Sequence, residues 1–293
     1  MLYIQLMRPQ HYIKNLLIFI CLICDGNLFS FPILFRCLVG FVAFSLLSSF
    51  IYIINDIFDA EADRHHEVKK HRPIASGAIT KWKAFLFSMI LLSISSIIIF
   101  VKQLGGIQSL IIVVTYLIIN LGYSFGLKHI PILDIILLVA GFMLRVSYGA
   151  VIVDSSVSSW VYLTVLSLSF YLGLGKRRNE LRKIERETGK TDGKTRKVLT
   201  SYNYDFLDKF MYMCLTLSIA FYALWSTDAK IIVRYGTDKL VWTVPLLIVI
   251  TMKYSYDIET GSYGDPVDVI TGDKWLMILG GTFALFIMGL IYL

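Results

Sequence analysis

Apolar residues fall in long runs along this chain. We draw nine apolar segments, at 13–30, 33–55, 82–101, 107–125, 131–153, 157–175, 207–226, 240–256 and 275–292. These lengths are close to the ~20 residues that an α-helix needs to cross a bilayer. Tight connections separate some of them, such as Gly105-Gly106 and Pro131. The pattern therefore predicts an all-α membrane protein with nine transmembrane helices.

Composition supports a membrane location for the whole chain. Of 293 residues, 56% are hydrophobic and only 17% are charged, and the mean hydropathy is +0.68. A soluble domain of this length rarely has so few charges. The N-terminus lacks the pattern of a cleavable signal, because Arg8 and Lys14 precede its apolar stretch and no small-residue cleavage site follows. The longest polar stretch, 176–204, is too short and too charged to build a core, so we expect one integral membrane catalytic domain over 1–293.

The positive charge follows the topology of a membrane protein. The net charge is +7, which in a soluble protein would suggest nucleic acid, but cytoplasmic loops of membrane proteins also collect Lys and Arg. With the N-terminus in the cytoplasm, most of the 28 Lys and Arg residues fall on the cytoplasmic side. The few that fall outside are Arg36, Lys102, Lys230, Arg234 and Lys239. We therefore expect a plasma-membrane protein with a cytoplasmic N-terminus, an outer C-terminus and no nucleic-acid partner.

An acidic row at the end of the second segment carries the strongest chemical signal. Asn55, Asp56, Asp59 and Asp63 are spaced i, i+1, i+4 and i+8, so on an α-helix they lie along one face. Like charges at this spacing repel one another, and a divalent cation relieves that repulsion. Oxygen ligands without cysteine suit Mg²⁺, which also binds substrate phosphates. A charged cap that ends a membrane helix is the simpler alternative, but it requires no such alignment.

Basic residues follow the acidic row. Lys69 and Arg72 come within ten residues of Asp63, where they can hold the charge of a departing diphosphate that the metal has partly neutralised. The row and its basic extension therefore predict a magnesium-dependent enzyme acting on a diphosphate at the cytoplasmic face. A transporter or channel is a more distant alternative, because transporters place polar sites near the bilayer midplane and only Arg145 lies mid-span.

The motif Asn-Asp-x-x-Asp-x-x-x-Asp, followed by the run from His71 to Gly77, resembles the first signature of the UbiA family of intramembrane prenyltransferases. That resemblance implies nine transmembrane helices around a central cavity that opens to lipid. It also implies a Mg²⁺-complexed diphosphate at the cytoplasmic mouth of the cavity, with Asn55, Asp56, Asp59 and Asp63 as metal ligands.

The N-terminal stretch points to one branch of that family. Residues 8–15 resemble the Arg-Pro-x-Gln-Trp-x-Lys-Asn opening of decaprenyl-phosphate phosphoribosyltransferases, although Gln10 sits one place early and Tyr12 replaces the tryptophan. The residues that match are Arg8, Pro9, Lys14 and Asn15. The resemblance implies that Lys14 and Asn15 bind substrate.

Two later stretches support the same branch. Lys176, Arg177 and Glu180 match its Lys-Arg-x-x-Glu-Leu motif, and Asp257 lies in a stretch that resembles its glycine-rich C-terminal loop. Aromatic prenyltransferases of the family instead carry a second Asp-x-x-x-Asp after the sixth helix, which this chain lacks. Phosphoribosyl diphosphate carries phosphate at two positions, so its enzyme should need more cations and fewer carboxylates. Ordinary positive-inside charge or an anionic-lipid contact is the alternative for the basic loop.

The loop from Asp257 to Gly272 contains Gly261 and Gly264, whose backbones can approach a phosphate closely. Its acids, Asp257, Glu259 and Asp265, could bind a second metal or ribose hydroxyls. An ordinary turn is the alternative. Arg145 either binds the lipid phosphate or pairs with a backbone carbonyl or a distant acid.

These observations predict transfer of 5-phosphoribose from phosphoribosyl diphosphate (PRPP) to a polyprenyl phosphate. Asp56, Asp59, Lys14 and Arg72 would be catalytic. The substrate-binding residues would be Lys14, Asn15, Lys69, Arg72, Arg145, Lys176, Arg177, Glu180 and Asp257. The nearer alternative is a prenyltransferase that moves a prenyl group from its diphosphate to an aromatic or lipid acceptor. The sequence leaves a homo-oligomer open.

Overall fold

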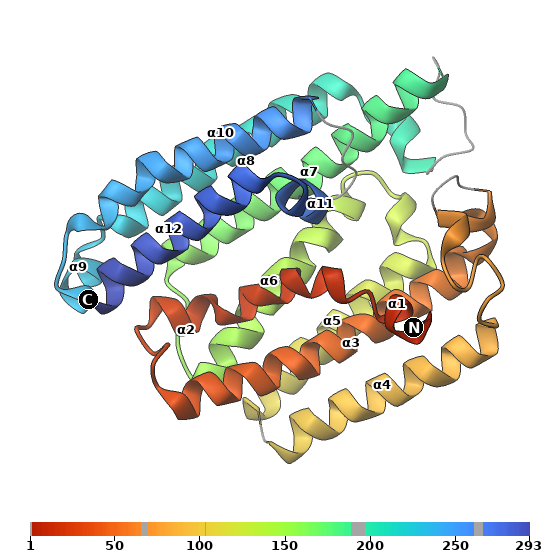
Figure 1. The fold of residues 1–293 in the computed structure, drawn as a ribbon, viewed down its shortest axis with the longest axis horizontal. Coiled ribbons are helices and arrows are strands. Elements are labelled where there is room, and N and C mark those ends of the chain that lie inside the picture. Colours follow the sequence, from red (N-terminus) through yellow and green to blue (C-terminus); the bar gives the residue numbers. More distant parts are fainter. Residues whose placement is uncertain (1, 66–68, 103, 189–196, 261–265) are drawn as a thin grey trace. The chain divides into compact units, whose positions relative to one another are not determined.

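The computed structural model describes residues 2–65, 69–102, 104–188, 197–260 and 266–293. Within these ranges the regular structure is entirely helical, which confirms the predicted fold class (Figure 1). The chain divides into two compact units, one of residues 1–128 and 144–156, the other of residues 129–143 and 157–293. The helix α6 (Leu133–Val153) contributes to both. That a single catalytic domain encloses a lipid-accessible cavity stays a prediction.

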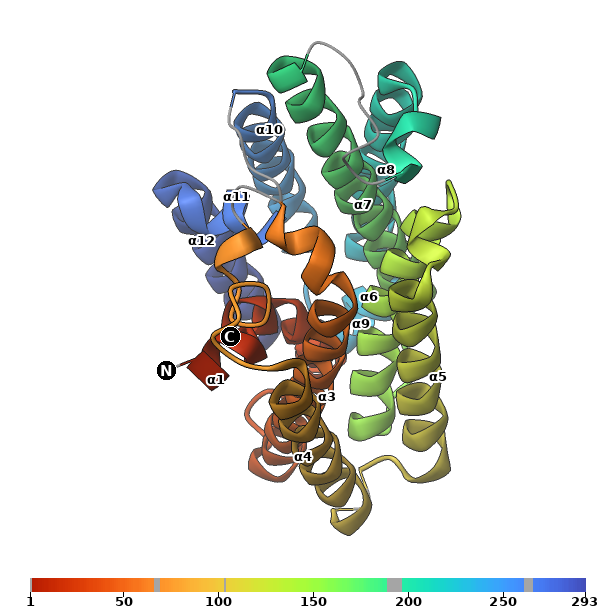
Figure 2. The same ribbon diagram turned by 90° about the vertical axis from the view of Figure 1, so that its right-hand side faces the viewer.

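The first unit contains the N-terminal helices. Its elements are α1 (Leu2–Met7), a 3₁₀ helix (Pro9–Phe19), α2 (Ile20–Cys24), α3 (Phe31–Arg64), a 3₁₀ turn (Lys69–His71), α4 (Lys81–Val101), α5 (Gly106–Phe125), a second 3₁₀ turn (Leu127–His129) and the second half of α6. The two views show α4 running alongside α3 (Figures 1 and 2). With 34 residues, α3 is about 51 Å long. This length exceeds a bilayer core, so the acidic row lies on the last turns of the same helix that forms the predicted second span.

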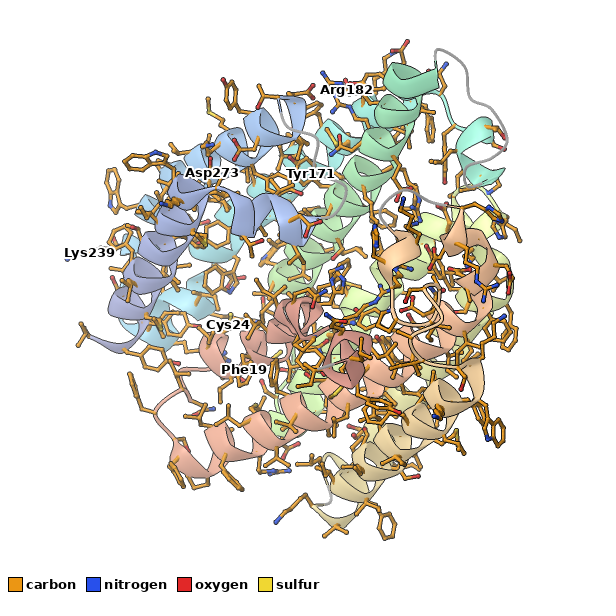
Figure 3. All side chains as sticks on the ribbon, turned by 45° about the vertical axis from the view of Figure 1, so that its right-hand side comes forward. Phe19, Cys24, Tyr171, Arg182, Lys239 and Asp273 are labelled. Carbon is orange, nitrogen blue, oxygen red and sulfur yellow. The ribbon has the colours of Figure 1, made fainter. Side chains whose placement is uncertain are left out.

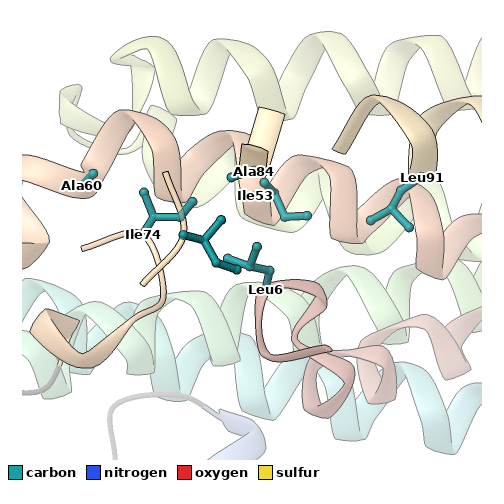
Figure 4. Close-up of a cluster of buried hydrophobic side chains, with 7 residues drawn as sticks. Leu6, Ile53, Ala60, Ile74, Ala84 and Leu91 are labelled. Atoms are coloured by element: carbon teal, nitrogen blue, oxygen red, sulfur yellow. The ribbon is translucent and has the colours of Figure 1, made fainter. Parts of the chain in front are cut away.

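A hydrophobic cluster fixes the segments around those last turns. Its buried members come from α1, α3, α4 and the loop before α4, and they are Leu6, Ile53, Ala60, Ile74, Ile79, Ala84 and Leu91 (Figure 4). Leu6 and Ile74 are 0% and 3% exposed. Because these two side chains pack into one core with Ile53, the N-terminus and the basic loop are held against the part of α3 that carries the acids.

The second unit contains the C-terminal helices. They are the first half of α6, α7 (Ser159–Thr188), a 3₁₀ helix (Lys197–Ser201), α8 (Tyr204–Ser226), α9 (Ala229–Tyr235), a 3₁₀ helix (Lys239–Thr243), α10 (Val244–Thr260), α11 (Pro266–Gly272) and α12 (Lys274–Tyr292). Side chains cap three of them: Asn203 accepts from the Asp205 N–H at α8, Asp228 from the Lys230 N–H at α9, and Asp273 from the Leu276 N–H at α12. Helix α7 packs along α8, and α10 packs against α8 and α12.

Six helices in the described ranges are long and apolar enough to cross a membrane, namely α3, α4, α5, α6, α8 and α12. The other three predicted segments, 13–30, 157–175 and 240–256, also fall on helical elements. The count of nine transmembrane helices therefore stays a prediction.

Candidate functional site: an acidic row ringed by cations

The acidic row lies on the last turns of α3 and is partly buried. Asp56 and Asp63 are 3% and 5% exposed, whereas Asn55 and Asp59 are half-buried. A carboxylate removed from water is unfavourable unless a cation or a set of hydrogen-bond donors compensates its charge. The positions of the surrounding cations therefore define the site.

Two arginines compensate the buried pair of carboxylates. The Arg72 Nη1 lies 3.1 Å from Asp56 Oδ1 and 2.6 Å from Asp63 Oδ2, so one guanidinium bridges both acids. The Arg8 Nη2 also donates to Asp56 Oδ1, and its guanidinium lies 5.6 Å from the centre of the Tyr52 ring. Arg8 has a φ of 53°, in the left-handed region that residues with a Cβ rarely adopt. This backbone conformation places Arg8 at the start of the 3₁₀ helix, where its side chain reaches α3.

A second group forms around Asp59. The Lys128 Nζ lies 2.5 Å from Asp59 Oδ1, and its side chain is 7% exposed. The Asn55 amide donates to Asp59 Oδ2 at 3.0 Å, and the Ser124 hydroxyl donates to Asn55 Oδ1 at 3.2 Å. The C-terminal end of α5 and the turn after it therefore contact the Asn55 and Asp59 side chains of the acidic row.

The donor set fits a hard divalent cation by its chemistry. Three carboxylates and an amide oxygen lie on successive turns of one helix, and oxygen-only sets of this kind suit Mg²⁺. In the described part of the chain, no three His, Cys, Asp or Glu side chains converge into a group that could hold a metal. The carboxylates are instead divided between Arg8 and Arg72 on one side and Lys128 on the other, so metal binding would have to draw them away from these cations.

Other residues predicted from the N-terminal half lie in different surroundings. Lys14 and Lys69 are half-buried, in the 3₁₀ helix and in the turn after α3. Asn15 is 0% exposed, and its Oδ1 accepts from Arg145 Nε at 2.7 Å. The Arg145 Nη2 donates to the Tyr116 hydroxyl at 2.9 Å. Arg145 is thus held by neutral side chains from the 3₁₀ helix and α5, and substrate binding by these four predicted residues stays a prediction.

In the second unit, Arg177 lies in a buried ion pair. Arg177 and Asp134 are both 0% exposed, and Nε lies 2.5 Å from Oδ2. The Arg177 Nη1 lies 2.8 Å from Glu180 Oε2, and the Tyr202 hydroxyl donates to Asp134 Oδ1 at 2.5 Å. Burial and the hydrogen bond to Asp134 raise the pKa of Tyr202, so its hydroxyl stays a donor. Arg177 therefore connects α7 to the start of α6 and also binds Glu180. Half-buried Lys176 precedes Arg177. Substrate binding by these three residues stays a prediction.

Acidic and basic side chains also meet near the end of α10. The Lys253 ammonium contacts Asp257, and it lies 2.6 Å from Asp273 Oδ2. That hydrogen bond from Lys253 lowers the pKa of Asp273. Asp257 is 7% exposed, and its Oδ1 accepts from the Lys253 ammonium.

Glu259 accepts from Arg178 and from Arg182, the latter at 2.9 Å. Figure 3 shows Arg182 towards the end of α7 and Asp273 at the start of α12. The predicted contributions of Gly261, Gly264 and Asp265 lie outside the described residues.

Three contacts of the site were not predicted from the sequence. Lys128 was recognised only as a cytoplasmic charge, and Arg8 only as part of the opening motif, yet both contact the acidic row. The pairing of Asp134 with Arg177 had no local signal, because the two lie 43 positions apart. For Arg8, its place in a matching motif was the one available signal.

Comparison with known proteins gives consistent results. The model of the UbiA prenyltransferase family matches residues 16–255. A decaprenyl-phosphate phosphoribosyltransferase of Corynebacterium glutamicum is 32% identical over 296 residues, covering 99% of this chain and 86% of the relative. The enzyme of the same name from Mycolicibacterium smegmatis is 32% identical over 291 residues, covering 94% and 88%.

Solved structures show the same fold. A UbiA homologue from Archaeoglobus fulgidus, bound to DMAPP and Mg²⁺, superposes with a TM-score of 0.70 at 18% identity and covers 99% of both chains. A structure of the same homologue bound to Cd²⁺ has a TM-score of 0.66 at 17% identity, over 100% of both chains.

Proposed function

The chain belongs to the UbiA prenyltransferase family, and from that premise we propose that it transfers 5-phosphoribose from phosphoribosyl diphosphate to a polyprenyl phosphate. Released diphosphate is the second product. The chain is an integral membrane transferase, as its family and the six apolar helices among its described residues indicate. The names of its relatives in Corynebacterium and Mycolicibacterium support phosphoribose as the transferred group and a polyprenyl phosphate as the acceptor.

The observation that carries the proposal is the convergence of cations on the acidic row. Arg8, Arg72 and Lys128 each contact a carboxylate that would otherwise be available to a metal. A site for a metal–diphosphate complex needs both kinds of group, carboxylates for the metal and cations for the phosphate oxygens. Here both kinds lie on, or directly against, the last turns of one helix.

The metal we propose is Mg²⁺, held by Asn55, Asp56, Asp59 and Asp63. When bound, it would neutralise the diphosphate and so improve it as a leaving group. Arg8, Arg72 and Lys128 contact these carboxylates. The three cations would donate to the phosphate oxygens and stabilise the negative charge that grows on the leaving diphosphate.

The reaction is a substitution at the ribose C1. The bond from C1 to the diphosphate oxygen breaks, and a bond from C1 to an oxygen of the acceptor phosphate forms. Carbon C1 gains oxocarbenium character between these events, as in glycoside cleavage. The acceptor phosphate is already anionic, so no strong general base is needed.

The remaining predicted residues take supporting roles. As substrate ligands, Lys14 and Lys69 would bring positive charge to the diphosphate, and Lys176 and Arg177 would bind the second phosphate of the donor. Glu180 and Asp257 accept from ribose hydroxyls. The distribution of Lys and Arg supports an N-terminus and an active site on the cytoplasmic side of the plasma membrane, with the C-terminus outside.

The choice of substrate is tested with purified full-length protein, Mg²⁺ and two substrate pairs. Phosphoribosyl diphosphate labelled in its ribose is supplied with a short polyprenyl phosphate. In parallel, a labelled prenyl diphosphate is supplied with an aromatic acid. The proposal expects ribose label to enter the organic phase in the first reaction and no prenyl ester or ring product in the second. The opposite outcome would assign prenyl transfer to this chain.

A further inference from the structure

The N-terminal 3₁₀ helix is unusually long. It covers 11 residues, Pro9–Phe19, whereas 3₁₀ runs longer than about 3–4 residues are uncommon because their hydrogen-bond geometry is poor. Contacts with other elements must therefore stabilise it. Since the helix begins directly after Arg8 and carries Lys14, the same contacts determine where these two cations lie.

One face of this helix repeats every three residues. Side chains at i and i+3 eclipse one another in a 3₁₀ helix, and Tyr12, Asn15 and Ile18 occupy this spacing, which continues to Cys21 in α2. Asn15, Ile18 and Cys21 are 0%, 0% and 4% exposed. The period of three explains why this stretch follows a 3₁₀ rather than an α path: it keeps all four side chains on the packed face.

Serines of α3 bind the first half of that face. The Tyr12 and Ser49 hydroxyls lie 2.7 Å apart, and the Asn15 amide donates to Ser45 Oγ at 3.0 Å. Ser49 also donates to the Met7 carbonyl at 3.0 Å. These bonds attach the segment to α3, and a second element contacts the same segment.

Helix α6 supplies that element. Arg145 is 5% exposed and donates to Asn15, and its guanidinium lies 5.4 Å and 5.0 Å from the centres of the Phe44 and Tyr116 rings. One turn later, Gly149 meets the Ile18 backbone so closely that a Cβ there would lie 2.0 Å from the Ile18 carbonyl oxygen. A charged hydrogen bond and a close backbone contact therefore hold the 3₁₀ helix at two points.

We propose that Arg145 is a positioning residue, which locks the N-terminal 3₁₀ helix through Asn15 and so places Arg8 at the acidic row. This assigns Arg145 an effect on the reaction without contact to substrate. The catalytic consequence rests on the proposed function, whereas the lock itself does not.

Two measurements on the full-length protein test the proposal. Backbone hydrogen exchange of residues 9–19, followed by mass spectrometry, reports the lock whatever the substrate is. Steady-state kinetics with phosphoribosyl diphosphate and a polyprenyl phosphate report its consequence. The variants are Arg145→Gln, Arg145→Lys and the double variant Arg145→Lys with Asn15→Asp, in which an ammonium–carboxylate bond replaces the lost one. Arg36→Gln, an exposed arginine of α3, is the matched control.

Loss of one charged hydrogen bond should raise exchange in 9–19 roughly tenfold. Arg145→Gln should also lower kcat by a larger factor than it raises the KM of either substrate. The double variant should regain exchange protection relative to Arg145→Lys alone. Unchanged exchange in Arg145→Gln would overturn the lock. A rise confined to the KM of the lipid phosphate, without faster exchange, would identify Arg145 as a substrate ligand instead. If the wild-type protein transfers no phosphoribose, the proposed function fails while the exchange result still decides the lock.

Discussion

The tight contact at Gly149 gives a prediction whose size follows from the structure. A Cβ at this position would lie 2.0 Å from the Ile18 carbonyl oxygen, and real Cβ atoms essentially never come within 3.0 Å of another heavy atom. In Gly149→Ala the Ile18 backbone must therefore retreat by about 1 Å, the difference between these values. Overpacking of this kind costs about 1–3 kcal/mol, and the better helix propensity of alanine returns about 1 kcal/mol.

The free energy of unfolding should therefore fall by only about 1 kcal/mol, but the rate of transfer should fall strongly. The displaced segment carries Arg8 and Lys14, and a 1 Å misplacement of groups at a reaction centre can lower the rate on the order of 100-fold. The assay compares phosphoribosyl transfer and thermal unfolding of Gly149→Ala with those of Gly280→Ala. Gly280 lies in α12 with no atom within 4 Å of its added Cβ, so this control should behave as wild type. Wild-type transfer by Gly149→Ala would refute the claim that this contact sets the position of the N-terminal cations.

Three further predictions concern ions and buried charge. Asp134→Asn removes the buried carboxylate partner of Arg177, which keeps Glu180, and should lower the unfolding free energy by about 3 kcal/mol, so an unchanged unfolding temperature would contradict the buried pair. Lys253 lowers the pKa of Asp273, so this stabilisation is present above the ordinary carboxyl pKa of 3.8 and is lost as the pH falls through the lowered value. Wild type and Asp273→Asn should therefore differ in Tm near neutral pH and converge in acid, and a constant difference would argue against the contact. EDTA should abolish transfer and added Mg²⁺ should restore it, whereas transfer that persists in EDTA would remove the metal from the mechanism.

The hydrophobic pattern predicted the fold class well because the bilayer constrains it strongly. Each apolar segment fell on a helical element, since a chain in lipid must satisfy its backbone hydrogen bonds internally. The residues at which helices end in polar stretches were less predictable. Helix α7 continues to Thr188, well beyond the predicted end at 175, because water tolerates a charged helix as readily as a loop. The first segment was drawn as one span, but it consists of a 3₁₀ helix followed by α2, and its period of three was not recognised in the sequence.

The acidic row was predictable because its geometry is local. One helix positions Asn55, Asp56, Asp59 and Asp63, so their spacing alone placed them on one face. Their partners could not be found this way. Arg8 and Lys128 lie 48 and 69 positions from the acids that they contact, and only the packing of α1 and α5 against α3 brings them together.

Arg145 shows the same limit. Its position mid-span marked it as a candidate substrate ligand, but the sequence could not show that Asn15, 130 positions away, accepts its hydrogen bond. A buried ionisable residue in a membrane protein can therefore serve the reaction by holding another element in place.

The most direct test of the acidic row as the catalytic centre compares two acids on the same helix. Asp59 lies on the row and contacts Lys128, whereas Glu61, two residues later, is 66% exposed and pairs with Arg64 at the surface. Transfer of ribose label from phosphoribosyl diphosphate to a polyprenyl phosphate is measured for Asp59→Ala and Glu61→Ala at saturating Mg²⁺. The account predicts that Asp59→Ala loses transfer and that Glu61→Ala retains it. Transfer by Asp59→Ala that equals transfer by Glu61→Ala and wild type would contradict a catalytic role for the row.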